Sequence, residues 1–298
     1  MHLHGELDLA LPHGATLGEG LLWQGGRWWW TDIESSTLHA WRPGTAGPQS
    51  CRLPDRLGSF AHTRSGRVLL GLAKRVAIIK LDEELGPGQL QTLAPVDPAE
   101  PRTRVNDGRT DRSGNFVFGT LNEAKEKRPI ASFYQFSMHH GLRRLALPAV
   151  AIANSICFSL DGRTMYFCDS MTPRIQQCDY DADTAQVAHV RPFTELDVEG
   201  ACPDGSVIDA EGCLWNAQWG GGRVARYDPQ GRLMAAFSAP AAHTSCPAIG
   251  GEGGDHLMLT TARADLGRDA LAAQPLSGSL FGLRLPKALA VPDTLFED

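Results

Sequence analysis

The chain has 298 residues, of which 42% are hydrophobic and 21% are charged, and its formal net charge is −6. Such a chain buries a large core without disulfide or metal staples. Its acidic balance and the lack of any Lys/Arg run argue against nucleic acid or an anionic membrane surface as a partner.

The N-terminal residues and the cysteines bear on the cellular compartment. MHLHGELDLALPHG lacks the basic start and apolar core of a secretory signal. No apolar run approaches the roughly 18–20 residues needed to cross a bilayer. The seven cysteines are odd in number and never form C-x-x-C. We therefore expect free thiols in a reducing cytoplasm and no structural zinc.

Short strand-like runs dominate the chain, and helical periodicity is hard to find. In chain order the clearest runs are RWWWTDI, RVLLGLA, NFVFGT, RTMYFCDS, CLWNAQW and HLMLTT. Each follows a polar turn that contains a marker glycine, at positions 26, 66, 114, 162, 212 and 254. The steps between these markers are 40, 48, 48, 50 and 42 residues. After most runs a second polar stretch leads to another strand that ends near Asp.

A period of this length, with several strands in each unit, is typical of a β-propeller. Six markers predict an all-β fold of six four-stranded blades around a central channel, forming a single domain over residues 1–298. We expect the N-terminal strand (3–9) to join the blade made by the C-terminal residues, because this removes an exposed sheet edge. A two-domain α/β chain would need amphipathic segments of about 10–15 residues between strands. Too few are found, and the best helix or long-loop candidate is 262–279.

Four polar residues precede the marker turns at nearly the same register. Asn106, Asn154 and Asp204 each lie eight residues before the marker glycine of their blade, and Glu19 lies seven before its own. Equivalent positions of the innermost strands converge at one end of a propeller channel. Two carboxylates and two amide oxygens there would suit calcium, magnesium or manganese, with zinc possible. Each residue taken alone could equally make an Asx turn.

The segment RVNDG (104–108) raises the same choice between a turn and a site. Its Asn-Asp-Gly is typical of a turn, but the hairpin turn of this blade is expected at DRSG (111–114). Arg104 lies two residues before Asn106 and thus on the same strand face. It could direct its guanidinium at an oxygen-rich ligand or form a surface salt bridge. No G-x-S-x-G motif supports an α/β-type serine hydrolase.

These motifs together resemble the SMP-30/gluconolactonase/regucalcin-like family. The resemblance runs from about residue 13 to 285 and rests on GEGLLW (18–23), WWTDI (29–33), RVNDGRTDRSGNFVFGT (104–120), NSICFSLDGRTMYFCDS (154–170) and PDGSVIDAEGCLWNAQWGGGRVARYDPQGRL (203–233). It implies a six-bladed propeller with one divalent metal ion at the channel mouth. The implied ligands are Glu19, Asn154 and Asp204, and the implied substrate contacts are Arg104, Asn106, Asp107 and Glu123.

Two departures from the family pattern bear on the pocket. This chain has Asn154-Ser155 where the family usually has Asn-Gly, and Glu19-Gly20-Leu21 where Glu-Ser-Pro or Glu-Gly-Pro is usual. Neither departure removes an implied ligand. Both could reshape the pocket, so they leave the identity of the substrate open.

The implied function is metal-dependent hydrolysis of a sugar lactone, an aldono-1,4- or 1,5-lactone, to the sugar acid. The metal (Ca, Zn, Mg, Mn or Fe) would act as a Lewis acid and Asp204 as the general base. The alternatives are a metal-dependent esterase or phosphotriesterase and a non-catalytic calcium-binding regulatory propeller. We expect a small-molecule sugar lactone as the partner and a monomer or small homo-oligomer. Arabinono-, xylono-, glucono- and galactonolactones all remain open.

Overall fold

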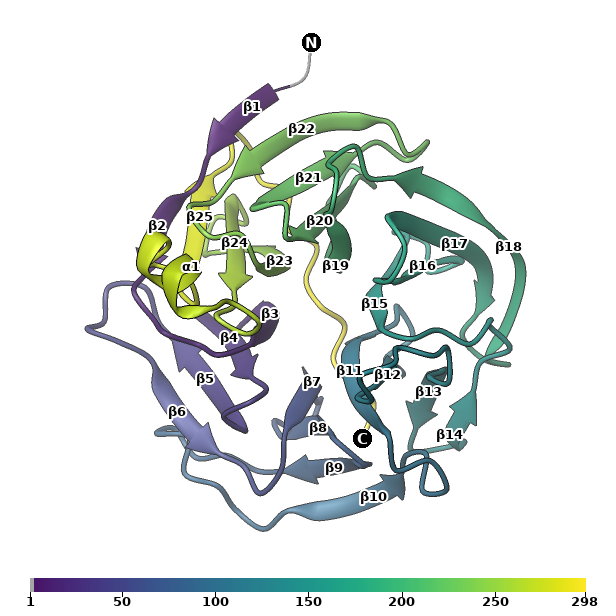
Figure 1. Ribbon diagram of the computed structural model, residues 1–298. Helices are drawn as coiled ribbons and strands as arrows, with labels where there is room; N and C mark the ends of the chain where they lie inside the picture. Colours follow the sequence, from purple (N-terminus) through teal and green to yellow (C-terminus); the bar gives the residue numbers. More distant parts are fainter. Residues whose placement is uncertain (1–2) are drawn as a thin grey trace.

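Six sheets surround a central channel in the computed structural model, which describes residues 3–298 (Figure 1). Consecutive sheets follow one another around the ring, so the predicted six-bladed β-propeller is confirmed. The described residues contain a single helix, α1 (Arg268–Ala273), which falls within the tract 262–279 that the sequence marks as a helix or long loop. Among residues 3–298, no helix is long and apolar enough to span a membrane.

Each blade is an antiparallel meander whose strands follow one another from the channel outward. Blade one contains β3 (Gly18–Gln24), β4 (Arg27–Asp32), β5 (Thr37–Trp41) and β6 (Gln49–Arg52). Blade two contains β7 (Leu57–His62), β8 (Val68–Leu72), β9 (Arg75–Ile79) and β10 (Gln91–Pro95). Blade three contains β11 (Thr103–Thr110), β12 (Phe116–Asn122), β13 (Phe133–Ser137) and β14 (Gly141–Arg144).

The remaining blades follow the same plan. Blade four contains β15 (Ala153–Phe158), β16 (Thr164–Asp169), β17 (Arg174–Asp181) and β18 (Gln186–Glu195). Blade five contains β19 (Cys202–Ile208), β20 (Leu214–Trp219), β21 (Arg223–Tyr227) and β22 (Leu233–Ser238). Blade six contains β23 (Thr244–Gly250), β24 (His256–Thr261) and β25 (Leu280–Arg284), with β2 (Asp8–Leu11) as its outermost strand.

The N-terminal segment belongs to two blades rather than one. β2 pairs antiparallel with β25 of blade six, whereas β1 (Leu3–Glu6) pairs in parallel with β22 of blade five. Leu7 lies between the two strands and is buried in the core that blades five and six share. The strand expected over residues 3–9 is therefore divided, because burial of Leu7 directs the chain from one blade edge to the next.

The marker glycines lie in the turn between the first and second strand of every blade. All six have positive φ, from 65° at Gly254 to 83° at Gly114, a conformation that residues with a side chain avoid. At DRSG the amide of Gly114 donates to the carbonyl of Asp111, as the sequence predicts for this hairpin. The repeat seen in the sequence is thus a repeat of one turn conformation.

The core is divided into six hydrophobic clusters, each between two neighbouring blades. Within the run Trp28–Trp30, Trp29 packs toward blade two, and Trp28 and Trp30 pack toward blade six. Successive side chains of a strand point to opposite faces. Because both faces of inner strands such as β8 and β12 are covered, these strands read as continuous apolar runs instead of alternating ones.

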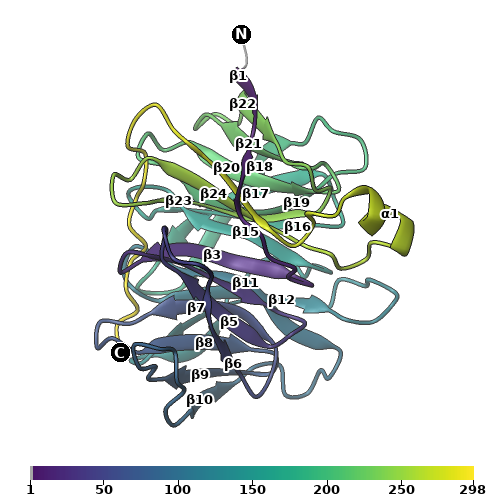
Figure 2. The ribbon, with the colours of Figure 1, turned by 90° about the vertical axis from the view of Figure 1, so that its left-hand side faces the viewer.

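The C-terminal segment crosses the channel at the end where the innermost strands finish (Figures 1 and 2). Asp293 pairs with Arg109 of β11 at 2.5 Å, and Phe296 is fully buried beside Thr63. Thr110 Oγ1 donates to the carbonyl of Thr294. The chain's own tail therefore covers this end, and the opposite end, where the innermost strands begin, is left for the site.

Candidate functional site

A cavity of about 490 Å³ opens where the innermost strands begin. Six of the seven predicted site residues line it: Glu19, Arg104, Asn106, Glu123, Asn154 and Asp204. Five of them lie on the innermost strands β3, β11, β15 and β19, and Glu123 follows the end of β12. Residues from four blades, separated by up to 185 positions in the chain, are thus brought to one cavity.

Each innermost strand that supplies a candidate ligand has a β-bulge at that position. The pairing register shifts between Glu19 and Leu22, Val105 and Gly108, Asn154 and Cys157, and Pro203 and Ser206. A bulge bends the strand and changes the direction of the side chains at the extra residue. The bulges therefore direct these polar side chains into the channel instead of into the core between blades.

Ser155 occupies the bulge of β15 with a φ of 61°, the left-handed region that favours glycine. Its hydroxyl donates to the carbonyl of Asp204 at 2.6 Å. This hydrogen bond joins blade four to blade five beside the candidate ligands. Serine in place of the family's usual glycine therefore adopts a less favourable backbone conformation but gains a hydrogen bond between two blades. Asn154 still lines the cavity.

A chain of hydrogen bonds fixes the orientation of the Asn154 amide. Arg104 Nη1 donates to Asn106 Oδ1 at 2.9 Å, and Asn106 Nδ2 donates to Asn154 Oδ1 at 3.0 Å. On the other side, Asn154 Nδ2 donates to Ser170 Oγ at 2.9 Å, and Ser170 donates in turn to the carbonyl of Pro203 at 2.7 Å. Since Ser170 gives its proton to Pro203, it must accept from Asn154. Asn154 Oδ1 therefore faces the site with one lone pair still available.

The carboxylates of Glu19 and Asp204 lie close together in a site with little compensating positive charge. Burial raises the pKa of both carboxyls, the negative charge of Asp107 raises both further, and the charge of Glu19 also raises the pKa of Asp204. Asp204 is 4% exposed, and its Oδ1 has no hydrogen-bond partner among the described residues. An ionised carboxylate oxygen left in this state is unfavourable unless a cation is bound.

These residues fit a divalent cation. Within residues 3–298 no three His, Cys, Asp or Glu side chains form a metal-binding group by themselves. The candidate set instead combines two carboxylates with the amide oxygen of Asn154. An all-oxygen set with open positions suits calcium, magnesium or manganese better than zinc in a structural site. The unpartnered Asp204 Oδ1 and the oriented Asn154 Oδ1 are the observations that favour such an ion.

Asp107 lies apart from the other predicted residues. It lines a separate chamber of about 20 Å³, deeper in the channel, together with Arg109, Cys246 and Asp293. Its Oδ2 accepts a hydrogen bond from the amide of Ile156 at 2.8 Å. The bulge places neighbouring residues at different depths, with Asn106 at the large cavity and Asp107 below it. Asp107 thus acts on Glu19 and Asp204 through its charge.

The wall beside Arg104 carries a group of alternating charges. Glu123 forms a bidentate pair with Arg56, at 2.5 and 2.9 Å, and its Oε1 lies 3.8 Å from Arg104 Nε. Burial alone would raise the pKa of Glu123, but the hydrogen bonds and charge of Arg56 outweigh it and the pKa is lowered. Glu34, which also lines the cavity, lies 3.8 Å from Arg56. Arg104 itself is 5% exposed, so its guanidinium is held at the cavity surface.

Arg56 was not among the predicted residues, although the sequence contains a signal for it. It lies ten residues before its marker glycine, as Arg104 does before its own. The candidate ligands are expected seven or eight residues before each marker glycine. In blade two these positions are Ser59 and Gly58, so Arg56 falls outside them. Ser170 carried no such signal, because it follows the second strand of blade four and reaches Asn154 only in the folded chain.

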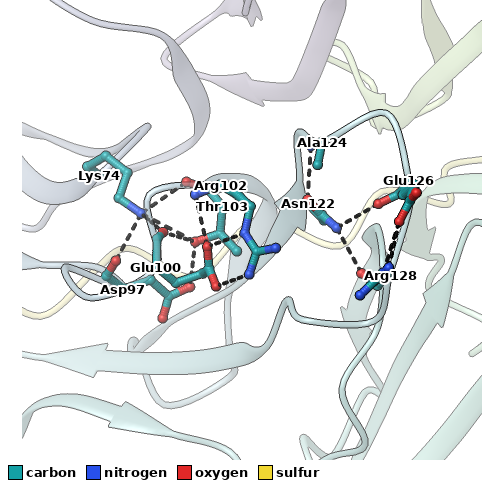
Figure 3. A network of polar contacts seen from close by, with 9 residues as sticks. All are labelled: Lys74, Asp97, Glu100, Arg102, Thr103, Asn122, Ala124, Glu126 and Arg128. Carbon is teal, nitrogen blue, oxygen red and sulfur yellow. Dashed lines mark hydrogen bonds and ion pairs between the residues drawn. The ribbon is translucent and has the colours of Figure 1, made fainter.

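Two networks of hydrogen bonds hold the segments on either side of this wall (Figure 3). Lys74 Nζ donates to the carbonyls of Asp97, Glu100 and Thr103 at 2.9–3.0 Å, which fixes the start of β11. Asn122 Nδ2 donates to the carbonyls of Glu126 and Arg128, and its Oδ1 accepts from the amide of Ala124. The short loop that carries Glu123 is thus closed on itself and presented in one conformation.

Comparison with known proteins agrees with this geometry. Residues 17–263 match the family model described as SMP-30/Gluconolactonase/LRE-like region. The chain is 44% identical over 285 residues to L-arabinolactonase of Azospirillum brasilense, covering 94% of this chain and 92% of that protein. It is 30% identical over 283 residues to regucalcin of Oryctolagus cuniculus, covering 93% of each.

The fold has a close counterpart among solved structures. A calcium-binding protein, regucalcin, from Agrobacterium tumefaciens superimposes with a TM-score of 0.90 at 29% identity, and all of both chains is covered. The match of the family model over most of the chain, together with the relatives above, confirms what the sequence motifs indicate: the chain belongs to the SMP-30/gluconolactonase/LRE-like family.

Proposed function

We propose that the protein is a metal-dependent lactonase that opens a sugar lactone to the corresponding sugar acid. The observation that carries the proposal is the group formed by Glu19, Asn154 and Asp204 on the floor of an open cavity, with Asp204 Oδ1 unpartnered. The similarity to an L-arabinolactonase over 94% of the chain supports a lactone substrate, with pentonolactones as the first to test.

A divalent ion held by Glu19, Asn154 and Asp204 would act as a Lewis acid toward the lactone carbonyl. Asp204 would also act as the general base that takes a proton from the attacking water. As the ring C–O bond breaks, the same proton passes to the departing ring oxygen. Ser155 and Asn216 donate to the Asp204 carbonyl at 2.6 and 3.0 Å, which keeps the base in position.

The walls of the cavity provide donors and acceptors for sugar hydroxyls. Arg104 uses Nη1 within the protein, which leaves its other N–H groups for the substrate. Glu123 remains an acceptor for a hydroxyl while Arg56 holds it ionised. Both polar atoms of Asn106 are engaged by protein groups, so we assign it chiefly to positioning Asn154.

A panel of lactones tests the proposal. Metal-stripped protein would be supplied with calcium, zinc, magnesium, manganese or iron(II), and proton release would be followed with L-arabinono-, D-xylono-, D-glucono- and D-galactonolactones. Asp204→Asn and Glu19→Gln should lose turnover while the circular dichroism spectrum is retained. Full activity in either variant, or in protein free of metal, would contradict the mechanism.

A non-catalytic calcium-binding role is the second candidate. The resemblance to a structure described as a calcium-binding protein favours it. This role predicts that calcium raises the melting temperature while no lactone is turned over. Aryl acetates and a phosphotriester, added to the same panel, test the remaining possibility of a broader esterase on the same site.

A further inference from the structure

The rim of the cavity is divided into a polar arc and an apolar arc. In blade three, Arg104 lies two residues before Asn106. In blade two, Arg56 lies at the same register, ten residues before its marker glycine. In blades four and five the equivalent residues are Ile152 and Cys202. Because the blades follow one another around the ring (Figure 1), the two arginines lie on one side of the mouth, and Ile152 and Cys202 lie on the other, where Asp265 also lines the cavity.

Trp219 is the largest side chain of the apolar arc. It is the last residue of β20, lines the cavity and is half-buried. Tryptophans that serve only the core of this protein are far less accessible, since Trp28, Trp30 and Trp215 are each at most 2% exposed. Among the described residues, no group accepts a hydrogen bond from the Trp219 indole N–H. Trp219 therefore presents an aromatic side chain to the cavity and has a donor available for a ligand.

His243 holds the indole ring in place. The two rings are stacked with their centroids 4.1 Å apart and an angle of 14° between their planes. His243 Nδ1 donates to the carbonyl of Ala264 at 2.9 Å, and burial lowers its pKa, so the ring is neutral near pH 7. One face of the indole is thus covered by a fixed imidazole, and only the remaining surface is available to a ligand.

We propose that Trp219 is a stacking platform for the C–H face of the sugar lactone ring, with His243 as its positioning residue. The inference rests on the proposed function and adds a determinant of substrate binding to it. A lactone whose carbonyl lies at the floor and whose hydroxyls meet Arg104 and Glu123 presents its C–H face to the opposite arc. Aromatic side chains combine a large apolar surface with a polar edge, which suits such a ring.

The test separates binding from catalysis. Trp219→Ala should raise KM for L-arabinono-1,4-lactone about five- to tenfold, the fold-change expected for loss of one aromatic contact, while kcat changes less than threefold. Trp219→Phe should recover most of the affinity, and His243→Phe should be milder than His243→Ala. Trp41→Ala is the matched control, because Trp41 is also half-buried but does not line the cavity. Calcium affinity should be unchanged in all of these variants.

A second readout does not depend on turnover. Binding of the non-hydrolysable L-arabinono-1,4-lactam would be measured by calorimetry for the wild-type protein and each variant. Weaker binding in Trp219→Ala with recovery in Trp219→Phe supports the platform even if the protein opens no lactone, in which case only the proposed function fails. Equal lactam affinity in wild type and Trp219→Ala, or no lactam binding by the wild type, overturns the inference.

Discussion

Substitution of Ser170 by alanine tests whether the hydrogen bond between Asn154 and Ser170 holds this candidate metal ligand in position. Ser170 is 8% exposed, and its hydroxyl accepts from Asn154 Nδ2 and donates to the carbonyl of Pro203. Ser170→Ala removes both hydrogen bonds and leaves the Asn154 amide held from one side only, by Asn106. The orientation of Asn154 Oδ1 would then be less firmly fixed.

The size of the effect follows from these contacts. Each buried group left without a partner costs about 1–3 kcal/mol, so we expect the free energy of unfolding of the metal-free protein to fall by about 2 kcal/mol. Loss of a residue that orients a metal ligand weakens metal binding about 10- to 100-fold, which corresponds to about 1.4–2.7 kcal/mol. Lactone turnover at limiting metal should fall by the same factor and recover partly at high metal concentration.

Calcium titration by calorimetry on metal-stripped protein measures the change in metal affinity, and urea unfolding measures the change in stability. Ser137→Ala is the matched control, since Ser137 is 7% exposed and accepts a hydrogen bond from the amide of His140 but does not line the cavity. It should lower stability without changing metal affinity. If Ser170→Ala bound calcium as tightly as the wild type, the orientation of Asn154 would not matter and the reasoning would be refuted.

Three further outcomes are expected. Asp293→Asn removes one of the two carboxylates that face the mostly buried Arg109 and should lower the free energy of unfolding by about 2 kcal/mol in urea titrations. Burial, and after it the charge of the neighbouring His13, lowers the pKa of His39 from 6.5 to about 4. The folded state therefore binds fewer protons than the unfolded state between these two pH values. The free energy of unfolding should fall as the pH drops from 6.5 toward 4, by up to about 3 kcal/mol. Calcium at a hundredfold excess over its Kd should stabilise the protein by about 2.7 kcal/mol in thermal melts.

Each of these outcomes has its own control. Combining Asp293→Leu with Arg109→Met should restore part of the stability, because the Arg109 charge is then no longer buried without Asp293, although Asp107 loses the neighbouring charge of Arg109; a further loss would argue against a charge effect. His39→Phe should flatten the pH dependence of unfolding between pH 6.5 and 4, and an unchanged slope would rule out His39 as a source. The stabilisation by calcium should disappear in Glu19→Gln combined with Asp204→Asn, and its persistence would place the ion elsewhere.

The positions of the cavity residues could be predicted from the sequence to a large extent. Asn106, Asn154 and Asp204 share one offset from their marker glycines, and all three line the same cavity. Arg56 could have been found by the same arithmetic at an offset of ten. The depth of Asp107 could not, because a bulge changes the direction of adjacent side chains and leaves no mark in the period-two pattern of a strand.

The N-terminal strand illustrates another limit of sequence reasoning. An apolar–polar alternation over residues 3–9 indicates a strand, but it does not say which sheet edge the strand will cover. Two blade edges lie within reach, and burial of Leu7 between them divides the segment into β1 and β2. The choice depends on packing of Leu7 against residues at least 200 positions away, such as Val207 and Phe281.

The number of blades, the turn between the first two strands of each blade and the register of the polar residues could all be inferred from the sequence alone. These features are local, because a glycine turn and a run of apolar residues carry their conformational preference wherever they occur. The orientation of the Asn154 amide, the pairing of Glu123 with Arg56 and the closure of the channel by Asp293 depend instead on how the blades pack. Those contacts join residues 48, 67 and 184 positions apart, and their geometry exists only when the blades close into a ring.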